Sequence, residues 1–207
     1  GSFVATTLAT GAEPRTAVFG DFDGDGDGDL AVTNHDDRTV STWTNTGAGF
    51  ASAATIPTGG IFRPEGIDAV DVDGDGDVDL VVGLGDEATP NVIGVLTNAG
   101  GTFSGPVTHP TGGLDSGQVA MADLDCDGIA DAVVSNSGSG TVSVLPGLAG
   151  GGLGAAMTMT AGANPSELAI GDLDADGDLD VIAADGDAAT VSVFVNVGCD
   201  GGGDPDP

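Results

Sequence analysis

A nine-residue pattern of aspartates, D-x-D-x-D-G-x-x-D, occurs four times in the 207-residue chain without a defect. Its copies begin at Asp21, Asp71, Asp123 and Asp172, so successive copies are 50, 52 and 49 residues apart. A near-constant spacing of this size is typical of repeat architectures, in which each repeat is one supersecondary unit. The chain is therefore expected to fold as four similar units.

Short β-rich runs flank every aspartate loop at matching positions. Residues 16–20 precede the first loop, and the runs 30–33, 39–44 and 50–56 follow it. Runs rich in β-branched residues and bounded by glycine or polar turns are a strand signature. Each unit is thus predicted to be a four-stranded antiparallel meander whose aspartate loop joins its first and second strands.

Four-stranded units with a period near 50 residues are characteristic of propeller blades. We predict an all-β fold, a β-propeller of four four-stranded antiparallel blades, over residues 1–199. The blade repeats are placed at about 11–59, 60–111, 112–161 and 162–199, and residues 200–207 form an acidic Gly/Pro linker or tail.

The last unit lacks a fourth strand in its own sequence. Residues 1–10 resemble the segments near 49–58 and 101–111 that supply this strand elsewhere, so we expect the N-terminal strand to complete the last blade. Two alternatives stay open: the four units are an excerpt of a longer propeller, or the N-terminal strand completes a neighbouring chain.

The charge balance excludes two classes of partner. The chain has 33 acidic and 3 basic residues, a formal net charge of −30, and phosphate binding needs cations, so nucleic acid and anionic membrane surfaces are excluded. No apolar run approaches the roughly 20 residues of a membrane span, which argues against membrane insertion. Because 40% of the residues are hydrophobic and 19 of the acids lie in the four loops, we expect a folded chain with localised charge.

The loops have the chemistry of a cation site. Two carboxylates about 4 Å apart repel by about 4 kcal/mol at an effective dielectric of about 20, so four aspartates in one short turn call for a cation. Hard oxygen ligands select calcium or magnesium, and a glycine at position six for the sharp turn favours calcium. EF-hand loops also need flanking helices and a glutamate at position twelve, which this chain lacks.

The predicted ligands are positions one, three, five, seven and nine of each loop. Isoleucine occupies position seven of the third loop, so the backbone carbonyl is the expected ligand at that position. An acidic turn without a metal is the alternative. The residues are Asp21, Asp23, Asp25, Asp27 and Asp29; Asp71, Asp73, Asp75, Asp77 and Asp79; Asp123, Asp125, Asp127, Ile129 and Asp131; and Asp172, Asp174, Asp176, Asp178 and Asp180.

With these loops in place, the chain resembles the FG-GAP or VCBS-type repeats of integrin-α-like β-propellers. Phe19-Gly20 before Asp21, and the stretch from Gly11 to Pro14 upstream, are similar to the motif halves that name the repeat. The resemblance implies calcium in the loops on one face of a propeller, and extracellular adhesion or ligand binding. Propellers of this family usually have about seven blades, whereas this chain supplies four.

A few other residues invite a functional interpretation. Trp43 aligns with large apolar residues of the other units, which favours packing between blades over sugar stacking. His35 and His109 have no partner at metal-ligand or triad spacing and are interpreted as bystanders. Whether Cys126 and Cys199 form a disulfide stays open, because sequence alone does not bring them within bonding distance.

The composition offers few candidate catalytic residues. The chain has no lysine, no tyrosine and no Ser-His pairing, so we expect a binding protein, not an enzyme. Paired acids for glycoside cleavage stay open, although no spacing singles out a pair. The acids outside the loops that were weighed are Asp36, Asp37, Glu65, Asp68, Glu87 and Asp115.

These observations favour an extracellular calcium-binding β-propeller that serves as an adhesion or interaction module, with calcium structural in the blade loops. Weak calcium sites would stay empty in resting cytosol, so a secreted or cell-surface location is expected, with a protein or glycan ligand. The alternatives are a subunit of a surface filament, assembled by strand exchange or calcium-mediated contacts, and a carbohydrate-binding lectin.

Overall fold

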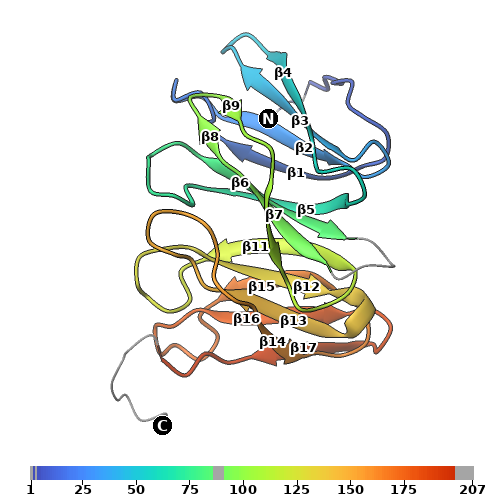
Figure 1. Cartoon of the computed structure of the whole chain (residues 1–207), viewed down its shortest axis with the longest axis vertical. Coiled ribbons are helices and arrows are strands. Elements are labelled where there is room, and N and C mark those ends of the chain that lie inside the picture. The colour runs from blue at the N-terminus through green and yellow to red at the C-terminus, as the bar shows by residue number, and fades with distance from the viewer. Residues whose placement is uncertain (1, 3, 86–90, 199–207) are drawn as a thin grey trace.

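The structure, a computed structural model, describes residues 2, 4–85 and 91–198. Its described residues form antiparallel β-sheets, stacked along the long axis of the molecule (Figure 1). The first sheet contains β1 (Pro14–Gly20), β2 (Asp29–Asn34), β3 (Thr39–Asn45) and β4 (Phe50–Pro57). The second contains β5 (Arg63–Val70), β6 (Asp79–Gly85), β7 (Val92–Leu96) and β10 (Val107–Pro110). The third contains β11 (Ser116–Ala122), β12 (Asp131–Asn136), β13 (Thr141–Leu145) and β14 (Met157–Thr160), and the last contains β15 (Pro165–Gly171), β16 (Asp180–Asp185) and β17 (Thr190–Phe194).

Two small elements complete the description. A separate two-stranded hairpin of β8 (Asn98–Ala99) and β9 (Thr102–Phe103) lies between β7 and β10 along the chain. The described helical structure is a single 3-10 turn, Ser137–Ser139. None of the described helices is long and apolar enough to cross a membrane.

The first strand of every sheet starts with the same irregularity. Its first residue pairs with the end of the second strand, and the register then shifts before regular pairing resumes. In three of the four strands the residue just before this shift is a proline (Pro14, Pro64 or Pro165), which has no N–H for a ladder bond and suits the start of a strand or a bulge. The repeat in sequence is therefore a repeat in backbone geometry.

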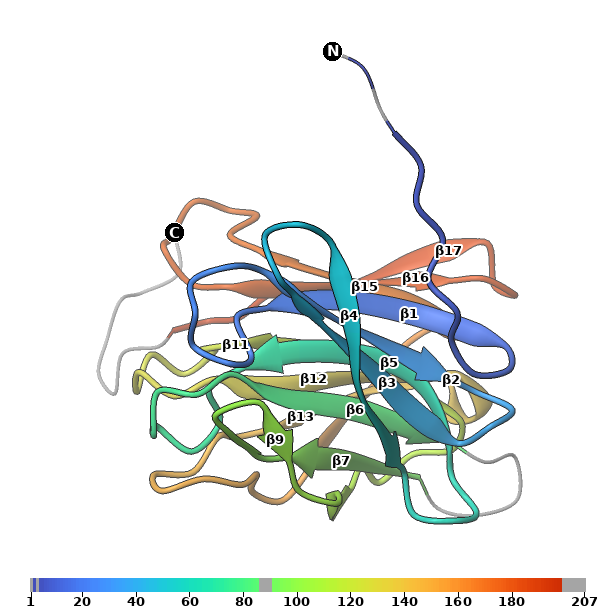
Figure 2. The ribbon, with the colours of Figure 1, turned by 90° about the horizontal axis from the view of Figure 1, so that it is seen from above.

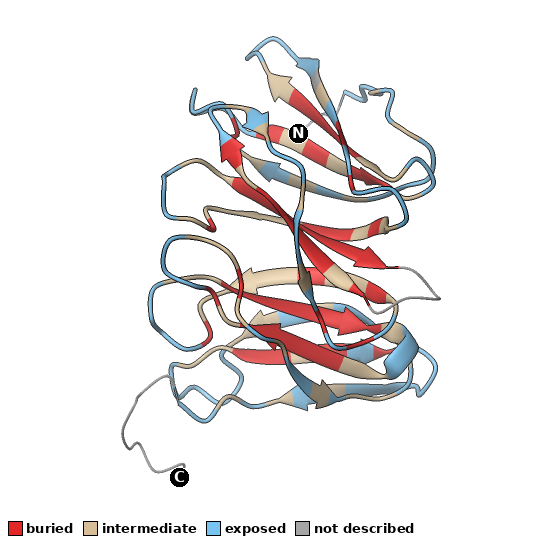
Figure 3. Cartoon of the chain, in the orientation of Figure 1, coloured by how far each residue is buried: buried red, intermediate tan, exposed pale blue. Residues whose placement is uncertain are grey.

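The core lies between the sheets. Three apolar clusters fill the spaces between the first and second, second and third, and third and last sheets, as the red central strands of Figure 3 show. Leu80 belongs to the first cluster, Val134 to the second and Val142 to the third, and all three are fully buried. Because the sheets pack face to face, the strands of the inner sheets are apolar on both sides. Trp43 is also buried, which leaves little of its ring accessible for the alternative of sugar stacking.

The stack of sheets is curved. Its curvature is seen in one hollow of about 520 Å³, which is lined by the first strands of all four sheets. β1 packs against β5, β5 against β11, and β11 against β15, but no comparable packing joins β15 to β1. The prediction of an all-β, antiparallel fold is confirmed. A closed four-bladed ring is not what the described residues form.

The prediction for the N-terminal strand is wrong in this structure. Residues 4–10 have no strand pairing and project from the first sheet (Figure 2), and the last sheet has three strands. The physical reason is distance: the first and last sheets lie at opposite ends of the stack (Figure 1), so this segment does not reach β17.

We predict that Leu80→Ala destabilises the fold by about 2–5 kcal/mol, because a fully buried leucine leaves a cavity between two sheets when it is truncated. Urea denaturation followed by circular dichroism measures the change. Val107→Ala is the matched control, since Val107 is 58% exposed and its truncation leaves no cavity. Equal losses for the two variants would contradict the assignment of the core.

Candidate metal centres in the aspartate loops

The four aspartate loops lie at the same edge of the molecule, at the left in Figure 1, because each joins the first and second strands of its sheet. The apolar residue at position two anchors three of them in the clusters between sheets: Phe22, Val72 and Leu124 are buried. The glycine at position six has a positive φ in every loop, between 85° and 102°. This conformation favours glycine, which explains why position six is invariant among the four copies.

Within each loop, the first aspartate organises the turn. In the first loop, Asp21 accepts hydrogen bonds from the backbone N–H groups of Gly24 (2.9 Å) and Gly26 (3.0 Å). In the second loop, Asp71 accepts the same two bonds from Gly74 (2.7 Å) and Gly76 (3.0 Å). These hydrogen bonds give the loop a defined turn around the carboxylate of its first aspartate.

The ninth aspartate holds the loop to the rest of its sheet. Asp79 is fully buried and accepts hydrogen bonds from Val72 N–H (2.9 Å) inside the loop and Asn98 N–H (2.7 Å) beyond β7. Asp29, Asp131 and Asp180 make the equivalent pairs of bonds. A carboxylate has about four lone-pair sites, so two bonds to N–H groups leave acceptor capacity for a cation.

Carboxylate oxygens of each loop converge. Positions one, three and nine of loops one, two and four have oxygens within 4.8 Å of one another, and positions one, three and five do so in the third loop. Those groups are Asp21, Asp23 and Asp29; Asp71, Asp73 and Asp79; Asp172, Asp174 and Asp180; and Asp123, Asp125 and Asp127. The remaining predicted ligands, including position seven, lie in the same loops outside these groups.

These groups fit a hard divalent cation. All donors are carboxylate oxygens, the ligand type that calcium and magnesium prefer. In the third loop, Asp123 Oδ1 is buried and has no hydrogen-bond partner, which is costly unless another group satisfies it. Burial raises the pKa of Asp79 and Asp131 above the usual 3.8, with further increases from nearby loop aspartates and partial opposition from their two N–H donors. Without a cation, the fold therefore disfavours the ionised state of these two carboxyls.

Asparagines that follow the third strand hydrogen-bond to the aspartate loops, and the pattern of aspartates did not predict them. Asn98 donates from Nδ2 to the carbonyl oxygens of Phe22 (2.7 Å) and Val78 (3.0 Å), so it joins the loops of two successive sheets. Asn196 does the same for Leu124 (2.7 Å) and Leu179. The signal was present in the sequence, because an asparagine recurs two residues after the large apolar residue of strand three.

His35 is not a bystander, contrary to the sequence prediction. Its Nε2 lies 2.9 Å from Glu65 Oε1 and its Nδ1 3.2 Å from Glu13 Oε2, while Arg63 pairs with Asp36 at 3.1 Å. These residues join the first sheet to the second at the edge opposite the aspartate loops. Spacing along the chain could not show this contact, because it depends on how two sheets stack.

The question of a disulfide, which the sequence left open, is addressed by the structure at one of the two cysteines. Cys126 takes position four of the third loop with a positive φ of 58° and is not a free thiol. Cys199, its proposed partner, lies outside the described residues.

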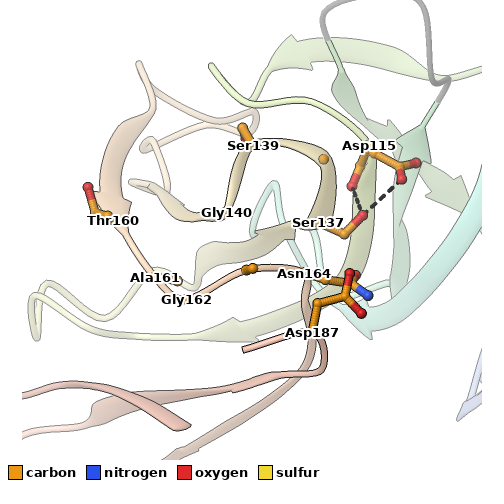
Figure 4. Close-up of a pocket in the computed structure, with 11 residues that line it drawn as sticks. Asp115, Ser137, Ser139, Gly140, Thr160, Ala161, Gly162, Asn164 and Asp187 are labelled. Atoms are coloured by element: carbon orange, nitrogen blue, oxygen red, sulfur yellow. Dashed lines mark hydrogen bonds between the residues drawn. The ribbon is translucent and has the colours of Figure 1, made fainter. Parts of the chain in front are cut away.

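The edge opposite the aspartate loops is hollowed. Besides the hollow between the first strands, a second one of about 690 Å³ opens between the turns of the third and last sheets (Figure 4). Carboxylates, an amide and hydroxyl groups line it, from Asp115, Ser137, Ser139, Thr160, Asn164 and Asp187. Ser137 Oγ donates to Asp115 Oδ2 at 2.9 Å, which orients that carboxylate. Polar groups in this arrangement can hydrogen-bond a polar ligand.

The repeat itself can be identified from the loop and strand pattern. Residues 21–82, which include the first two aspartate loops, match the family model of the FG-GAP-like repeat. This chain contains an FG-GAP-like repeat. The resemblance found in the sequence is thereby confirmed.

Solved structures share the fold of this chain at low identity. BBS1N, solved in complex with ARL6DN, aligns with a TM-score of 0.59 at 16% identity over 90% of this chain and 57% of its own. A lectin of Agrocybe aegerita that recognises non-reducing terminal N-acetylglucosamine aligns with a TM-score of 0.57 at 22% identity, over 89% and 50%. The rhamnogalacturonan lyase YesW gives 0.59 at 16% identity, over 84% and 41%. The chain thus spans about half the length of these structures, and a comparison with curated proteins finds no match.

The raised pKa values predict an unusual pH dependence in divalent-free buffer. In the unfolded chain these carboxyls titrate near 3.8, whereas Asp79 and Asp131 titrate higher in the fold. Between the two values the folded state binds more protons, so stability falls as pH rises through that window.

Melting curves from about pH 4 to pH 7 measure this slope with and without calcium. With calcium present the slope should weaken or reverse, because the ion binds the ionised form. Stability that rises with pH in divalent-free buffer would contradict the raised pKa values.

Proposed function

We propose that this chain is a calcium-stabilised interaction module that works outside the cell. The observation that supports it most directly is the convergence of carboxylates in all four loops, each tied to its sheet through a buried ninth aspartate. The FG-GAP-like repeat at 21–82 supports the same function, because such repeats are typical of extracellular proteins.

Calcium has a structural role in this proposal. An ion in a loop neutralises the repulsion between its carboxylates and thereby stabilises the bonds from the ninth aspartate to the hairpin beyond strand three. Extracellular calcium modules bind at about 10⁻⁴–10⁻³ M. At a free calcium concentration about ten times the dissociation constant, each site contributes about 1.4 kcal/mol.

Ligand binding is assigned to the edge opposite the loops. That edge contains the two hollows, and its turns join strands without contributing to the ion sites. A carbohydrate is the second candidate ligand, favoured by the carboxylate, amide and hydroxyl groups around the hollow of Figure 4. A protein partner at the cell surface is the first. A glycan array, repeated with Asp115→Ala, separates the two: sugar binding lost in the variant supports the carbohydrate, and an array without signal removes it.

We predict that calcium raises the melting temperature and that EDTA lowers it. A domain of this size shifts by about 2–4 °C per kcal/mol, so four filled sites of about 1.4 kcal/mol each move the midpoint by about 10–20 °C. Differential scanning calorimetry measures the shift. An unchanged melting temperature in EDTA would rule out the structural role.

Asp23→Ala should remove one ion from the four measured by isothermal titration calorimetry. Asp23 is the best choice because its bond to the loop backbone is long (3.3 Å), so truncation perturbs the turn least. Asp187→Ala is the matched control: it removes the same charge at the opposite edge and should leave the stoichiometry unchanged. A count of four ions in both variants would contradict the assignment of Asp23 as a ligand.

A further inference from the structure

The last sheet exposes apolar side chains at positions that the inner sheets bury. Val191 and Val193 of β17 are 61% and 53% exposed. Their counterparts in β13, Val142 and Val144, are 0% and 9% exposed, because the last sheet covers them. The outer face of the last sheet therefore has the composition of a packing surface without a sheet on it.

The last aspartate loop shows the same lack of a cover. Leu173, at position two, is 48% exposed, whereas Leu124 at the equivalent position of the third loop is 8% exposed. Asn196 from the last sheet bonds to the Leu124 carbonyl, so each loop is normally closed by the following sheet. The fourth loop has no following sheet among the described residues.

The first sheet presents the complementary surface. Phe19 of β1 is 68% exposed, although the equivalent residues Met121 and Ile170 pack against the preceding sheet. The two ends of the stack thus differ in kind. One lacks a following sheet, and the other lacks a preceding one.

An unpaired strand edge and an unpaired segment accompany these faces. The inner sheets carry a fourth strand beside strand three, but β17 has none. Residues 4–9 have no strand pairing. Their connection to the first sheet begins where Thr10 Oγ1 and Gly11 N–H donate to Asn34 Oδ1 (2.5 and 3.1 Å) and Ala12 N–H donates to Asp37 Oδ2 (2.7 Å). This connection runs into β1 just as the end of β4 runs into β5.

The repeat sets the register in which the segment would pair. A threonine of the fourth strand lies opposite the same position of strand three in all three complete sheets: Thr55 opposite Ser41, Thr108 opposite Gly94, and Thr158 opposite Ser143. Continued to the last sheet, this register places Thr7 opposite Ser192. It also places Leu8 opposite Val191, as Met159 lies opposite Val142.

We propose that copies of this chain associate head to tail through these ends. Residues 4–9 of one copy pair with β17 of the next copy as its missing fourth strand. The first sheet of the donor, with Phe19, then covers Val191, Val193 and Leu173 of the acceptor.

A second copy fits better than the chain's own N-terminus. The first and last sheets lie at opposite ends of the stack (Figure 1), so pairing within one chain requires the whole stack to close, whereas a second copy continues it unchanged. Such a contact is heterologous: it closes into a ring if the rotation permits and otherwise extends as a filament. Edge strands with exposed apolar residues are sites of this kind of strand addition.

Light scattering coupled to size exclusion tests the proposal on the full chain. The expected mass is two or more times the 19.8 kDa of one chain, and it rises with protein concentration. Val193→Lys, which charges the acceptor face, and the double variant Thr6→Pro, Thr7→Pro should each return the mass to that of one chain. Alternate residues of an antiparallel pair donate to the partner, so one of two adjacent prolines removes a ladder bond. Neither proline lies in a strand of the isolated fold, so folding should be unaffected.

Val107→Lys is the matched control, since Val107 is equally exposed (58%) on the outer strand of another sheet and should not change the mass. A labelled peptide of residues 1–10 should bind the double-proline variant, whose β17 edge is free, and not the Val193→Lys variant. A full chain that stays at 19.8 kDa at every concentration would overturn the proposal, and peptide binding in that case would assign the edge to the chain's own segment. An assembly that survives both variants would overturn it as well.

Discussion

Face-to-face packing of β-sheets is the interaction on which the rest of this molecule depends. No single unit can bury its own strands, because a four-stranded meander that is apolar on both sides needs a neighbour on each side. The three clusters between sheets supply that burial, with residues such as Leu80, Val134 and Val142 removed from water completely. Three of the four aspartate loops are positioned by the same contacts, since the apolar residue at position two of each (Phe22, Val72 or Leu124) inserts into a cluster between sheets. The candidate ion sites and the core therefore depend on the same packing between sheets.

This coupling explains how a chain of net charge −30 can fold compactly. The other carboxylates of each loop lie at the molecular edge, while the ninth aspartate is buried and accepts two bonds from backbone N–H groups, which leaves acceptor capacity for a cation. Asn98 and Asn196 then join the loop of one sheet to that of the next. A cation in one loop would thus stabilise the hairpin beyond it and, through these asparagines, the interface to the neighbouring sheet. Ion binding and sheet stacking would therefore support each other through these hydrogen bonds between sheets.

Much of this organisation could be predicted from the sequence, because local repeats encode local structure. The period of the aspartate pattern, the strands on either side of each loop and the turn at the position-six glycine are all properties of about fifty neighbouring residues. The contacts of His35 could not be predicted, since Glu65 and Arg63 reach it only when two sheets stack. The N-terminal segment was misassigned for a related reason. Its sequence matches a fourth strand, but sequence similarity says nothing about how far the stack curves between its first and last sheets.

The two edges of the sheets differ in how closely their turns repeat. At one edge, every connection between first and second strands repeats the same nine-residue pattern, because each must hold converging carboxylates in one geometry. At the other edge, the turns after the second strands differ from sheet to sheet: His35 and Asp36 form ion pairs in the first, and Ser137 opens the 3-10 turn beside the hollow in the third. Turns that hold no cluster of carboxylates can differ in sequence from one sheet to the next. A scaffold fixed at one edge can therefore carry a variable surface at the other, and the hollow around Asp115 and Asn164 lies at that second edge.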